Sequence, residues 1–212
     1  YGIAMLIPLG KLILSVAGAT ALFICVVALI ASLFTGINFF HVIRALKDIL
    51  FLAFSTASSE AALPGAMKRL EELGVPKTIV TFVMPTGYSF NLDGSTLYSS
   101  AGILFIAQLY GIQMPIEQQL LVMVTLMLST KGIAGVPGAG IIVVAATAAA
   151  FNLPTEGVAI LLGIDRLLDM IRTICNVCGN CMATVVVACW EKELNKATFN
   201  EKYRAFLGGK NR

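Results

Sequence analysis

Long apolar runs, separated by short polar stretches, dominate this chain. The first run, 12–34, has 23 uncharged residues, which is enough to cross a bilayer with some tilt. Later runs are interrupted near their centres by polar residues, Gly or Pro, which a lipid-exposed helix does not tolerate. In chain order, we predict a transmembrane helix (1–35), a re-entrant hairpin (36–75), a broken transmembrane helix (76–113), a second re-entrant hairpin (114–153), a polar transmembrane helix (154–190) and a tail (191–212).

The two hairpins are predicted to enter the membrane from opposite sides. The first is interrupted at 55–65 by three serines, a glutamate and a proline, and cationic stretches flank it. The positive-inside tendency therefore places both of its ends in the cytoplasm, together with the tail and its six Lys or Arg. The second hairpin has a Gly-rich tip at 129–140 and flanks without cations, so it is predicted to open from outside. Opposed hairpins of this kind indicate an inverted-topology transporter core.

Two polar features are predicted at membrane depth. The first is Asn91–Gly94, which lies between the apolar halves 78–90 and 95–112 and indicates an unwound break that lines a cavity. The second is the polar stripe of the last span. At 100° per residue its members fall within about 80° of one another, so we expect them to share one face and to line a wet cavity. The polar stripe consists of Asp165, Asp169, Arg172, Asn176 and Asn180.

Seven ionisable groups are expected near membrane depth. At about 3 kcal/mol each, exposing them to lipid would cost on the order of 20 kcal/mol. A water-filled cavity with a bound ion or solute would offset that cost. The seven are Glu60, Asp93, Lys131, Asp165, Arg166, Asp169 and Arg172.

Composition supports the membrane assignment and narrows the class of protein. Hydrophobic residues make up 58% of the chain and charged residues 13%, whereas a soluble domain has about 25% charged residues. The net charge of +3 does not indicate nucleic-acid binding, because the cations lie at segment ends. The chain starts at Tyr1 without a recognisable signal peptide, so we expect it to be part of a longer polypeptide.

Four motifs in order resemble one known family. They are SSEAALP (58–64), NLDGS (91–95), KGIAGVPGAG (131–140) and GIDRLLDMIRTICNVCGN (163–180). Together they resemble the dicarboxylate/amino acid:cation symporter family, which includes the glutamate transporters, and within it the bacterial proton/glutamate branch. The resemblance, which covers most of 6–190, implies a secondary active symporter rather than an enzyme. It also implies a homotrimeric elevator carrier in the bacterial inner membrane, whose scaffold region is missing from this chain.

The resemblance implies a substrate site for an acidic amino acid. Arg172 would pair with the side-chain carboxylate of the substrate, although it could instead pair with Asp165 or Asp169 to stabilise the helix. Asp169 would accept the α-ammonium group, which favours an amino acid over a dicarboxylate. Thr173 and Asn176 would add hydrogen bonds, unless they only bond to their own helix. The complete predicted set is Arg172, Asp169, Thr173, Asn176, Ser58, Ser59, Thr96, Gly135, Val136, Pro137 and Gly138.

The resemblance also implies a coupling-ion site without a further cofactor. Asn91 and Asp93 would supply oxygen ligands for Na⁺, or Asp93 would take a proton; alternatively they cap the broken half-helices. Asn180 stands where sodium-driven relatives carry aspartate, and Lys131 adds positive charge at the second hairpin, so a full set of sodium ions is in doubt. Glu60 is our candidate for the coupled proton, paired with Lys131 or Arg166. The coupling set is Asn91, Asp93, Asn176, Asn180 and Glu60.

Other interpretations remain open at this stage. A C4-dicarboxylate symporter is the near alternative, and an intramembrane aspartyl protease that uses Asp93 with Asp165 or Asp169 is a remote one. Such a protease needs one protonated carboxyl group, which the nearby Arg172 opposes. The CxxCxxC pattern of Cys175, Cys178 and Cys181 favours small core residues over a metal cluster. His41 is expected to serve packing.

Overall fold

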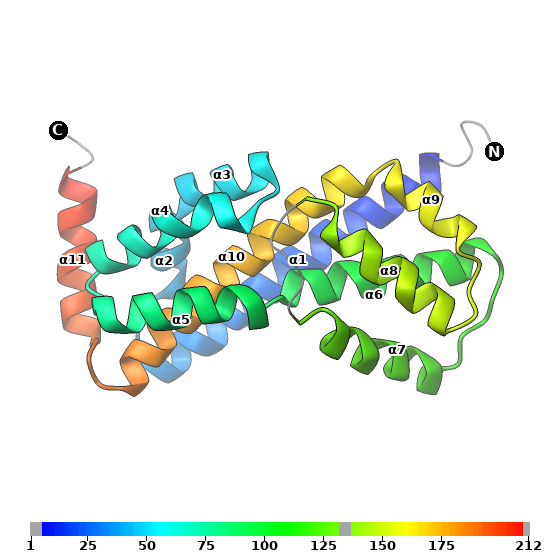
Figure 1. The fold of residues 1–212 in the computed structure, drawn as a ribbon. Helices are drawn as coiled ribbons and strands as arrows, with labels where there is room; N and C mark the ends of the chain where they lie inside the picture. Colours follow the sequence, from blue (N-terminus) through cyan, green and yellow to red (C-terminus); the bar gives the residue numbers. More distant parts are fainter. Residues whose placement is uncertain (1–5, 132–136, 210–212) are drawn as a thin grey trace.

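Eleven helices make up the described residues, 6–131 and 137–209, of the computed structural model (Figure 1). Two of them are long and apolar enough to cross a membrane: α1 (Leu6–Thr35) and α10 (Asp165–Trp190). These two helices pack against each other, and α10 runs through the middle of the elongated bundle. All regular structure in the described residues is helical, as predicted for the fold class.

Two shorter helices follow one another along the side of α10. They are α5 (Lys77–Phe90) and α6 (Asp93–Leu109), and both pack on α10. Between them, Asn91 and Leu92 leave the helical conformation, with ψ angles of 74° and 51°. The predicted break is therefore present, and it exposes the last carbonyl groups of α5 and the first N–H groups of α6 at mid-length of the bundle.

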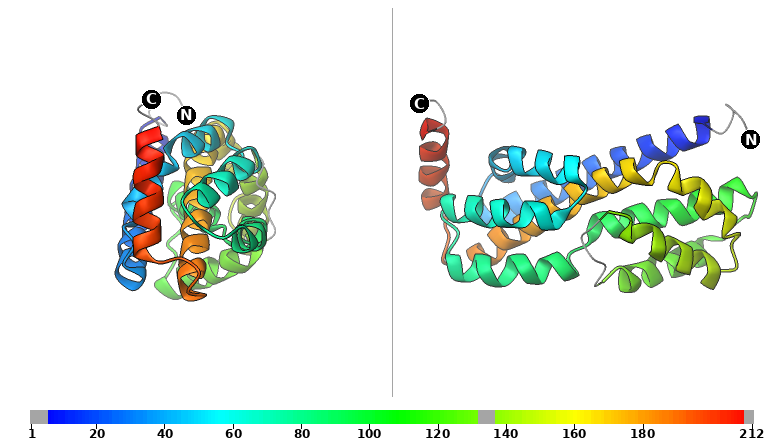
Figure 2. Two further views of the ribbon diagram at one scale, coloured as in Figure 1. Left: turned by 90° about the vertical axis from the view of Figure 1, so that its left-hand side faces the viewer. Right: turned by 45° about the horizontal axis from the view of Figure 1, so that its top comes forward.

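Two helical hairpins lie in opposite halves of the bundle, and the turn of the first is directed toward its centre (Figures 1 and 2). The first consists of α3 (Lys47–Thr56) and α4 (Ser59–Glu72). At its turn, Ala57 adopts a φ of 51°, and the side chain of Ser58 accepts a hydrogen bond from the N–H of Ala61 at 3.4 Å. Ser58 therefore serves as the N-cap of α4.

The second hairpin consists of α7 (Ile116–Ser129) and α8 (Ala139–Ala150). Both described arms are helical, and the re-entrant hairpin at 114–153 stays a prediction. The predicted site residues Gly135 and Val136 lie outside the described residues. The membrane boundaries of both hairpins, and the sides from which they enter, stay predictions.

Two apolar clusters fill the two halves of the bundle. One gathers around Leu46, Leu70 and Met84 beside the first hairpin, and the other around Ile106 and Leu126 beside the second. The α10 side chains between the two clusters are mostly polar. The folded chain thus holds a buried polar layer at its centre, between two hydrophobic cores.

The structure differs from the predicted segments in three places. The last span divides into α9 (Glu156–Leu162) and α10, because the chain forms a tight turn at Gly163, a poor helix former. The polar stretch before the first hairpin contains a short helix, α2 (Phe39–Ala45). The tail forms α11 (Lys196–Gly209).

Two aromatic residues dock helix α11 onto the bundle. Phe199 is fully buried, and Tyr203 stacks on His41 with ring centroids 4.6 Å apart. His41 therefore takes part in packing, as expected. The cation–π contact of Arg69 with the Phe206 ring, at 4.5 Å, adds a further link between α11 and the first hairpin.

Candidate functional site

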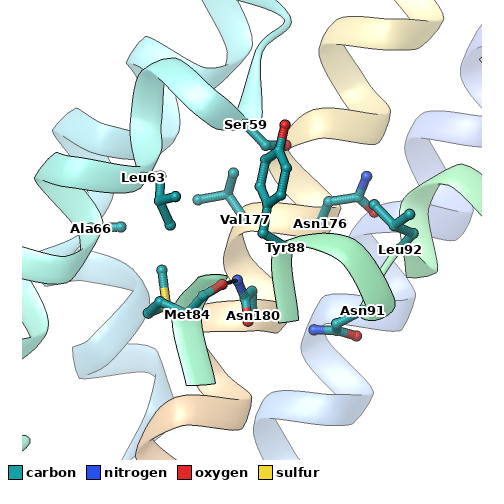
Figure 3. A pocket seen from close by; sticks show the side chains of 10 residues that line it. All are labelled: Ser59, Leu63, Ala66, Met84, Tyr88, Asn91, Leu92, Asn176, Val177 and Asn180. Atoms are coloured by element: carbon teal, nitrogen blue, oxygen red, sulfur yellow. Dashed lines mark hydrogen bonds between the residues drawn. The ribbon is translucent and has the colours of Figure 1, made fainter. Parts of the chain in front are cut away.

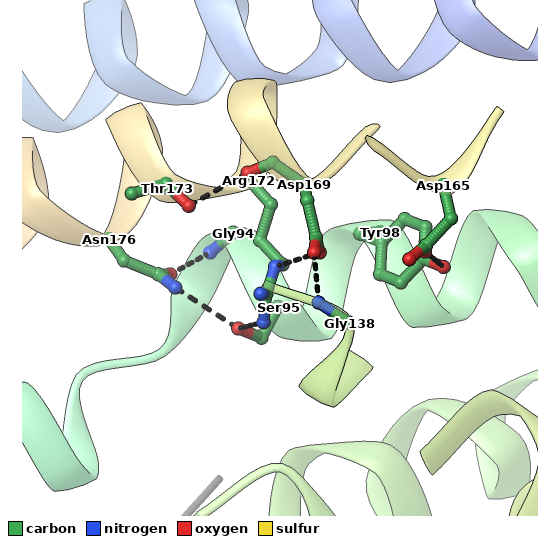
Figure 4. A network of polar contacts seen from close by, with 9 residues as sticks. All are labelled: Gly94, Ser95, Tyr98, Gly138, Asp165, Asp169, Arg172, Thr173 and Asn176. Atoms are coloured by element: carbon green, nitrogen blue, oxygen red, sulfur yellow. Dashed lines mark hydrogen bonds and ion pairs between the residues drawn. The ribbon is translucent and has the colours of Figure 1, made fainter. Parts of the chain in front are cut away.

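The polar stripe of α10 is almost completely enclosed by protein. Its five side chains retain between 1% and 8% of their accessible surface. We expected the stripe to line an open, wet cavity, and in this conformation the described residues do not form one. Protein groups from α6 and from the second hairpin fill that place instead, and they satisfy most of the charges directly (Figure 4).

Arg172 and Asp169 form a buried ion pair at the centre of this site. Nε of Arg172 lies 2.9 Å from Oδ1 of Asp169, and the two side chains are 2% and 1% exposed. The two atoms are close, but the contact lacks the angle of a hydrogen bond. Nη1 of Arg172 also donates a hydrogen bond to Oγ of Ser95 at 3.2 Å. The sequence left Asp165 and Asp169 open as internal partners of Arg172, and in the structure Arg172 pairs with Asp169.

The second hairpin supplies another partner for Asp169. The backbone N–H of Gly138 donates a hydrogen bond to Oδ2 of Asp169 at 2.5 Å. Gly138 is the N-cap of α8 and adopts a φ of 80°, which glycine permits without a steric penalty. The positive end of the α8 dipole therefore faces the carboxylate. Pro137, beside it, is exposed.

The start of α6 packs closely on the polar stripe. Oδ1 of Asn176 accepts a hydrogen bond from the N–H of Gly94 at 2.8 Å, and Nδ2 of Asn176 donates to Ser95 at 3.0 Å. A Cβ atom at Gly94 would overlap the carbonyl oxygen of Arg172 and lie 2.7 Å from Cβ of Cys175. Glycine is therefore required for the helix break to lie against α10.

The remaining polar residues on this side have partners of their own. Asp165 accepts a hydrogen bond from the hydroxyl of Tyr98 at 2.6 Å. The hydroxyl of Thr173 donates to the carbonyl of Asp169 at 2.7 Å, which is back-bonding within its own helix. Thr96 lies 3.0 Å from Thr130, oxygen to oxygen, and so links α6 to the end of α7.

A cavity of about 10 Å³, enough for roughly one water molecule, lies along the other part of the polar stripe (Figure 3). Ser59, Asn91, Asn176 and Asn180 all line it. Nδ2 of Asn180 donates a hydrogen bond to the carbonyl of Met84 at 2.8 Å, whereas its Oδ1 has no hydrogen-bond partner in the described part of the chain. The predicted residues of the first hairpin, the helix break and α10 therefore meet here.

Asn91 and Asp93 both approach α10 at Gly179. A Cβ atom at Gly179 would lie 3.3 Å from Nδ2 of Asn91 and 3.3 Å from Oδ2 of Asp93. The two predicted ion ligands thus lie near each other, beside the helix break. The described residues contain no group of three His, Cys, Asp or Glu side chains placed to hold a metal ion.

The predicted pairing of Glu60 with Lys131 or Arg166 is wrong in this conformation. Glu60 accepts a hydrogen bond from the hydroxyl of Tyr88 at 2.8 Å. Lys131 donates to the carbonyl of Phe90 at 2.7 Å, at the end of α5. Arg166 donates to the carbonyls at the end of α3, at 3.2 and 3.4 Å. Each cation is drawn to the negative end of a helix rather than to the carboxylate.

Three contacts of the candidate site were not predicted from the sequence. Ser95 connects Arg172 with Asn176, Tyr98 holds Asp165, and Tyr88 holds Glu60. Ser95 and Tyr98 follow the helix break by three and six residues, so their proximity to the break was the available signal. Tyr88 had no sequence signal, because its partner lies 28 residues away on another helix.

Comparisons with known proteins agree with the motifs. A model of the sodium:dicarboxylate symporter family matches residues 1–190. The chain is 53% identical over 197 residues to the proton/sodium-glutamate symport protein of Geobacillus stearothermophilus, covering 92% of the chain and 47% of that relative.

Two further relatives cover almost the whole chain. The proton/glutamate-aspartate symporter of Escherichia coli (strain K12) is 48% identical over 208 residues, which is 98% of the chain and 48% of that relative. The C4-dicarboxylate transport protein of Burkholderia pseudomallei (strain 668) is 43% identical over 210 residues, or 99% and 48%. The chain spans about half the length of the curated relatives it matches.

Proposed function

The chain belongs to the sodium:dicarboxylate symporter family, and we propose that it provides the substrate site of a carrier for acidic amino acids. The substrates would be L-glutamate and L-aspartate, taken up together with H⁺, Na⁺ or both. The names of the relatives that are 53% and 48% identical, a proton/sodium-glutamate symport protein and a proton/glutamate-aspartate symporter, support this assignment.

The ion pair of Arg172 with Asp169 carries the proposal. The two buried charges neutralise each other at 2.9 Å. An acidic amino acid brings one ammonium group and a side-chain carboxylate, so it can insert between them and give each protein charge a new partner of opposite sign. A C4-dicarboxylate would satisfy Arg172 but leave Asp169 buried without a cation, which is costly.

Substrate entry requires protein contacts to open first. The N–H of Gly138 holds Asp169, and the hydroxyl of Ser95 holds Arg172. We assign the gate to the second hairpin, because withdrawal of α8 would release Asp169 and open the polar stripe to solvent. Thr96 contacts Thr130 at the end of α7, and this contact would change in the same movement.

The coupling ions would bind beside the substrate. Asn91 and Asp93 lie together at the helix break and offer oxygen atoms of the kind that hard cations prefer. At Asn180 an amide takes the place of a carboxylate, so this position adds no negative charge for a cation. Glu60 remains our candidate for the proton, with Tyr88 as its partner. The first hairpin, through Ser58 and Ser59, would close the site from the cytoplasmic side.

The larger architecture follows from family membership as part of the proposal. The two hairpins, the broken span and α10 would form a mobile transport domain that moves as an elevator. A scaffold region outside this chain would assemble a homotrimer in the bacterial inner membrane, with the C-terminus in the cytoplasm. An aspartyl protease is less well supported, since the two candidate partners of Asp93 already bind other groups: Asp165 binds Tyr98, and Asp169 pairs with Arg172.

Uptake into proteoliposomes tests the proposal. Full-length protein is reconstituted, and a proton gradient and a sodium gradient are imposed separately while labelled L-aspartate uptake is measured. We expect uptake with at least one gradient, and stronger competition from unlabelled L-glutamate than from succinate. Stronger competition from succinate would replace the proposal with the C4-dicarboxylate alternative, which the Burkholderia pseudomallei relative represents.

A further inference from the structure

An apolar groove lies between the C-terminal ends of the two longest helices. It has a volume of about 570 Å³, within the range of about 300–1,000 Å³ that is typical of ligand sites. Ile30 and Phe34 of α1 form one wall, and Val186 and Trp190 of α10 form the other. Figure 1 shows these two helix ends side by side, away from the polar stripe at the centre of the molecule.

Two lysines stand at the mouth of this groove. Lys192 lies two residues after the end of α10, and Lys196 begins α11; both line the groove and both are exposed. Within the described chain neither lysine forms an ion pair. Glu191 and Glu193 flank Lys192 in sequence, but neither of them lines the groove. The mouth is therefore cationic, while the interior is apolar.

The two lysines come to the groove from different local structures. Lys192 adopts a φ of 62°, in the left-handed region where glycine is preferred. The stem of Lys196 lies across Gly36, with its Cδ 3.8 Å from the position that a Cβ would take there. The two lysines thus reach one groove from separate places in the chain, one after α10 and one at the start of α11.

The groove also lies where a membrane surface is expected. If α1 and α10 span the bilayer, as proposed above, their C-terminal ends reach the cytoplasmic boundary. Trp190 is 81% exposed and Phe34 is 87% exposed at that level. Aromatic side chains and lysines gather at this depth in membrane proteins, and lysines beside the cytoplasmic leaflet attract anionic lipids.

From this juxtaposition we propose that the groove binds an anionic phospholipid. One acyl chain lies between α1 and α10, and the phosphate lies between the ammonium groups of Lys192 and Lys196. The inference rests on the membrane placement in the proposed function, but not on the substrate assigned there. It adds a ligand site that is separate from the polar stripe.

Trp190, the single tryptophan of this chain, gives a direct readout. Full-length protein is placed in nanodiscs that contain a small fraction of brominated phosphatidylglycerol or, in parallel, brominated phosphatidylcholine. The emission due to Trp190 is the difference between the wild type and the Trp190→Phe variant. At the electrostatic scale of two lysines near a membrane surface, we expect about 30-fold tighter association of the anionic lipid at low salt.

Two double variants test whether the two lysines cause the preference for the anionic lipid. Lys192→Gly with Lys196→Gln should abolish the preference, and the glycine suits the left-handed backbone at 192, so the fold is preserved. The control, Lys68→Gln with Lys77→Gln, removes the same charge on the same predicted side, away from the groove, and should retain the preference.

Three results would overturn the lipid site. They are equal quenching by both lipids, a preference that survives in the groove variant, and no quenching by either lipid. The last result would mean that protein covers the groove. Aspartate uptake is measured in the same preparations to distinguish the two proposals. Carriers that transport normally but show no lipid preference refute the lipid site alone.

Discussion

Replacing Asp169 by asparagine removes one charge from the central ion pair at almost constant volume. The charged atoms are 2.9 Å apart, so at an effective dielectric constant of about 20 their direct attraction is roughly 6 kcal/mol. Desolvation offsets part of this attraction. Removing one partner from a buried pair typically costs about 3–5 kcal/mol, because the other charge stays buried. Arg172, at 2% exposure, is such a charge.

We therefore expect the Asp169→Asn variant to lose about 3–5 kcal/mol of unfolding free energy. Unfolding of the full-length protein in detergent measures the loss. The control is Glu117→Gln, which removes the same charge from an exposed position on α7 and should change stability by no more than about 0.5 kcal/mol.

Ligands should rescue the variant selectively. Succinate supplies a carboxylate for Arg172. At about 100 times its dissociation constant, it would raise the unfolding free energy of the variant by roughly 2.7 kcal/mol. Aspartate should stabilise the variant less than succinate does, because its ammonium group has lost the acceptor. A stability loss below about 1 kcal/mol would refute the buried pair. Stronger stabilisation by aspartate would refute the role of Asp169 as the ammonium acceptor.

Three other substitutions test separate parts of the structure. Gly140→Ala places a Cβ 2.8 Å from the ring of the buried Tyr98, so thermal unfolding should show a loss of about 1–3 kcal/mol in unfolding free energy. In the control, Gly65→Ala, the nearest atom lies 3.5 Å away, so this variant should not be destabilised. Phe199→Ala empties a fully buried position and should lower the free energy of unfolding by about 3–5 kcal/mol; an unchanged value would mean that α11 does not dock. Glu60→Gln should reduce substrate-driven proton uptake, and undiminished uptake would exclude Glu60 as the proton carrier.

The sequence predicted most of the scaffold because its strongest signals are local. An aspartate and a glycine between apolar halves located the break at Asn91 and Leu92 to within two residues. The angular spacing of the polar stripe placed its members on one buried face of α10. The polar interruption at 55–65 predicted the turn of the first hairpin, where Ser58 caps α4.

The parts that could not be predicted depend on distant contacts. Whether the polar stripe faces water or protein is decided by Gly138 and Ser95, which come from two other helices. Opposite charge suggested that Glu60 would attract a cation, but Lys131 bonds instead to the carbonyl end of α5. The docking of α11 had a usable signal, since Phe199 and Tyr203 are four residues apart on one helix face.

Equilibrium binding of L-aspartate to the full-length protein is the most direct test of the central claim, that Arg172 receives the substrate carboxylate. Calorimetry should show binding by the wild type and a loss of at least about 100-fold in Arg172→Ala, the scale of two charged hydrogen bonds. Arg172→Lys keeps a cation for Asp169 but cannot make a bidentate pair, so it should fold and still bind weakly. Unchanged aspartate affinity in either variant would contradict the account.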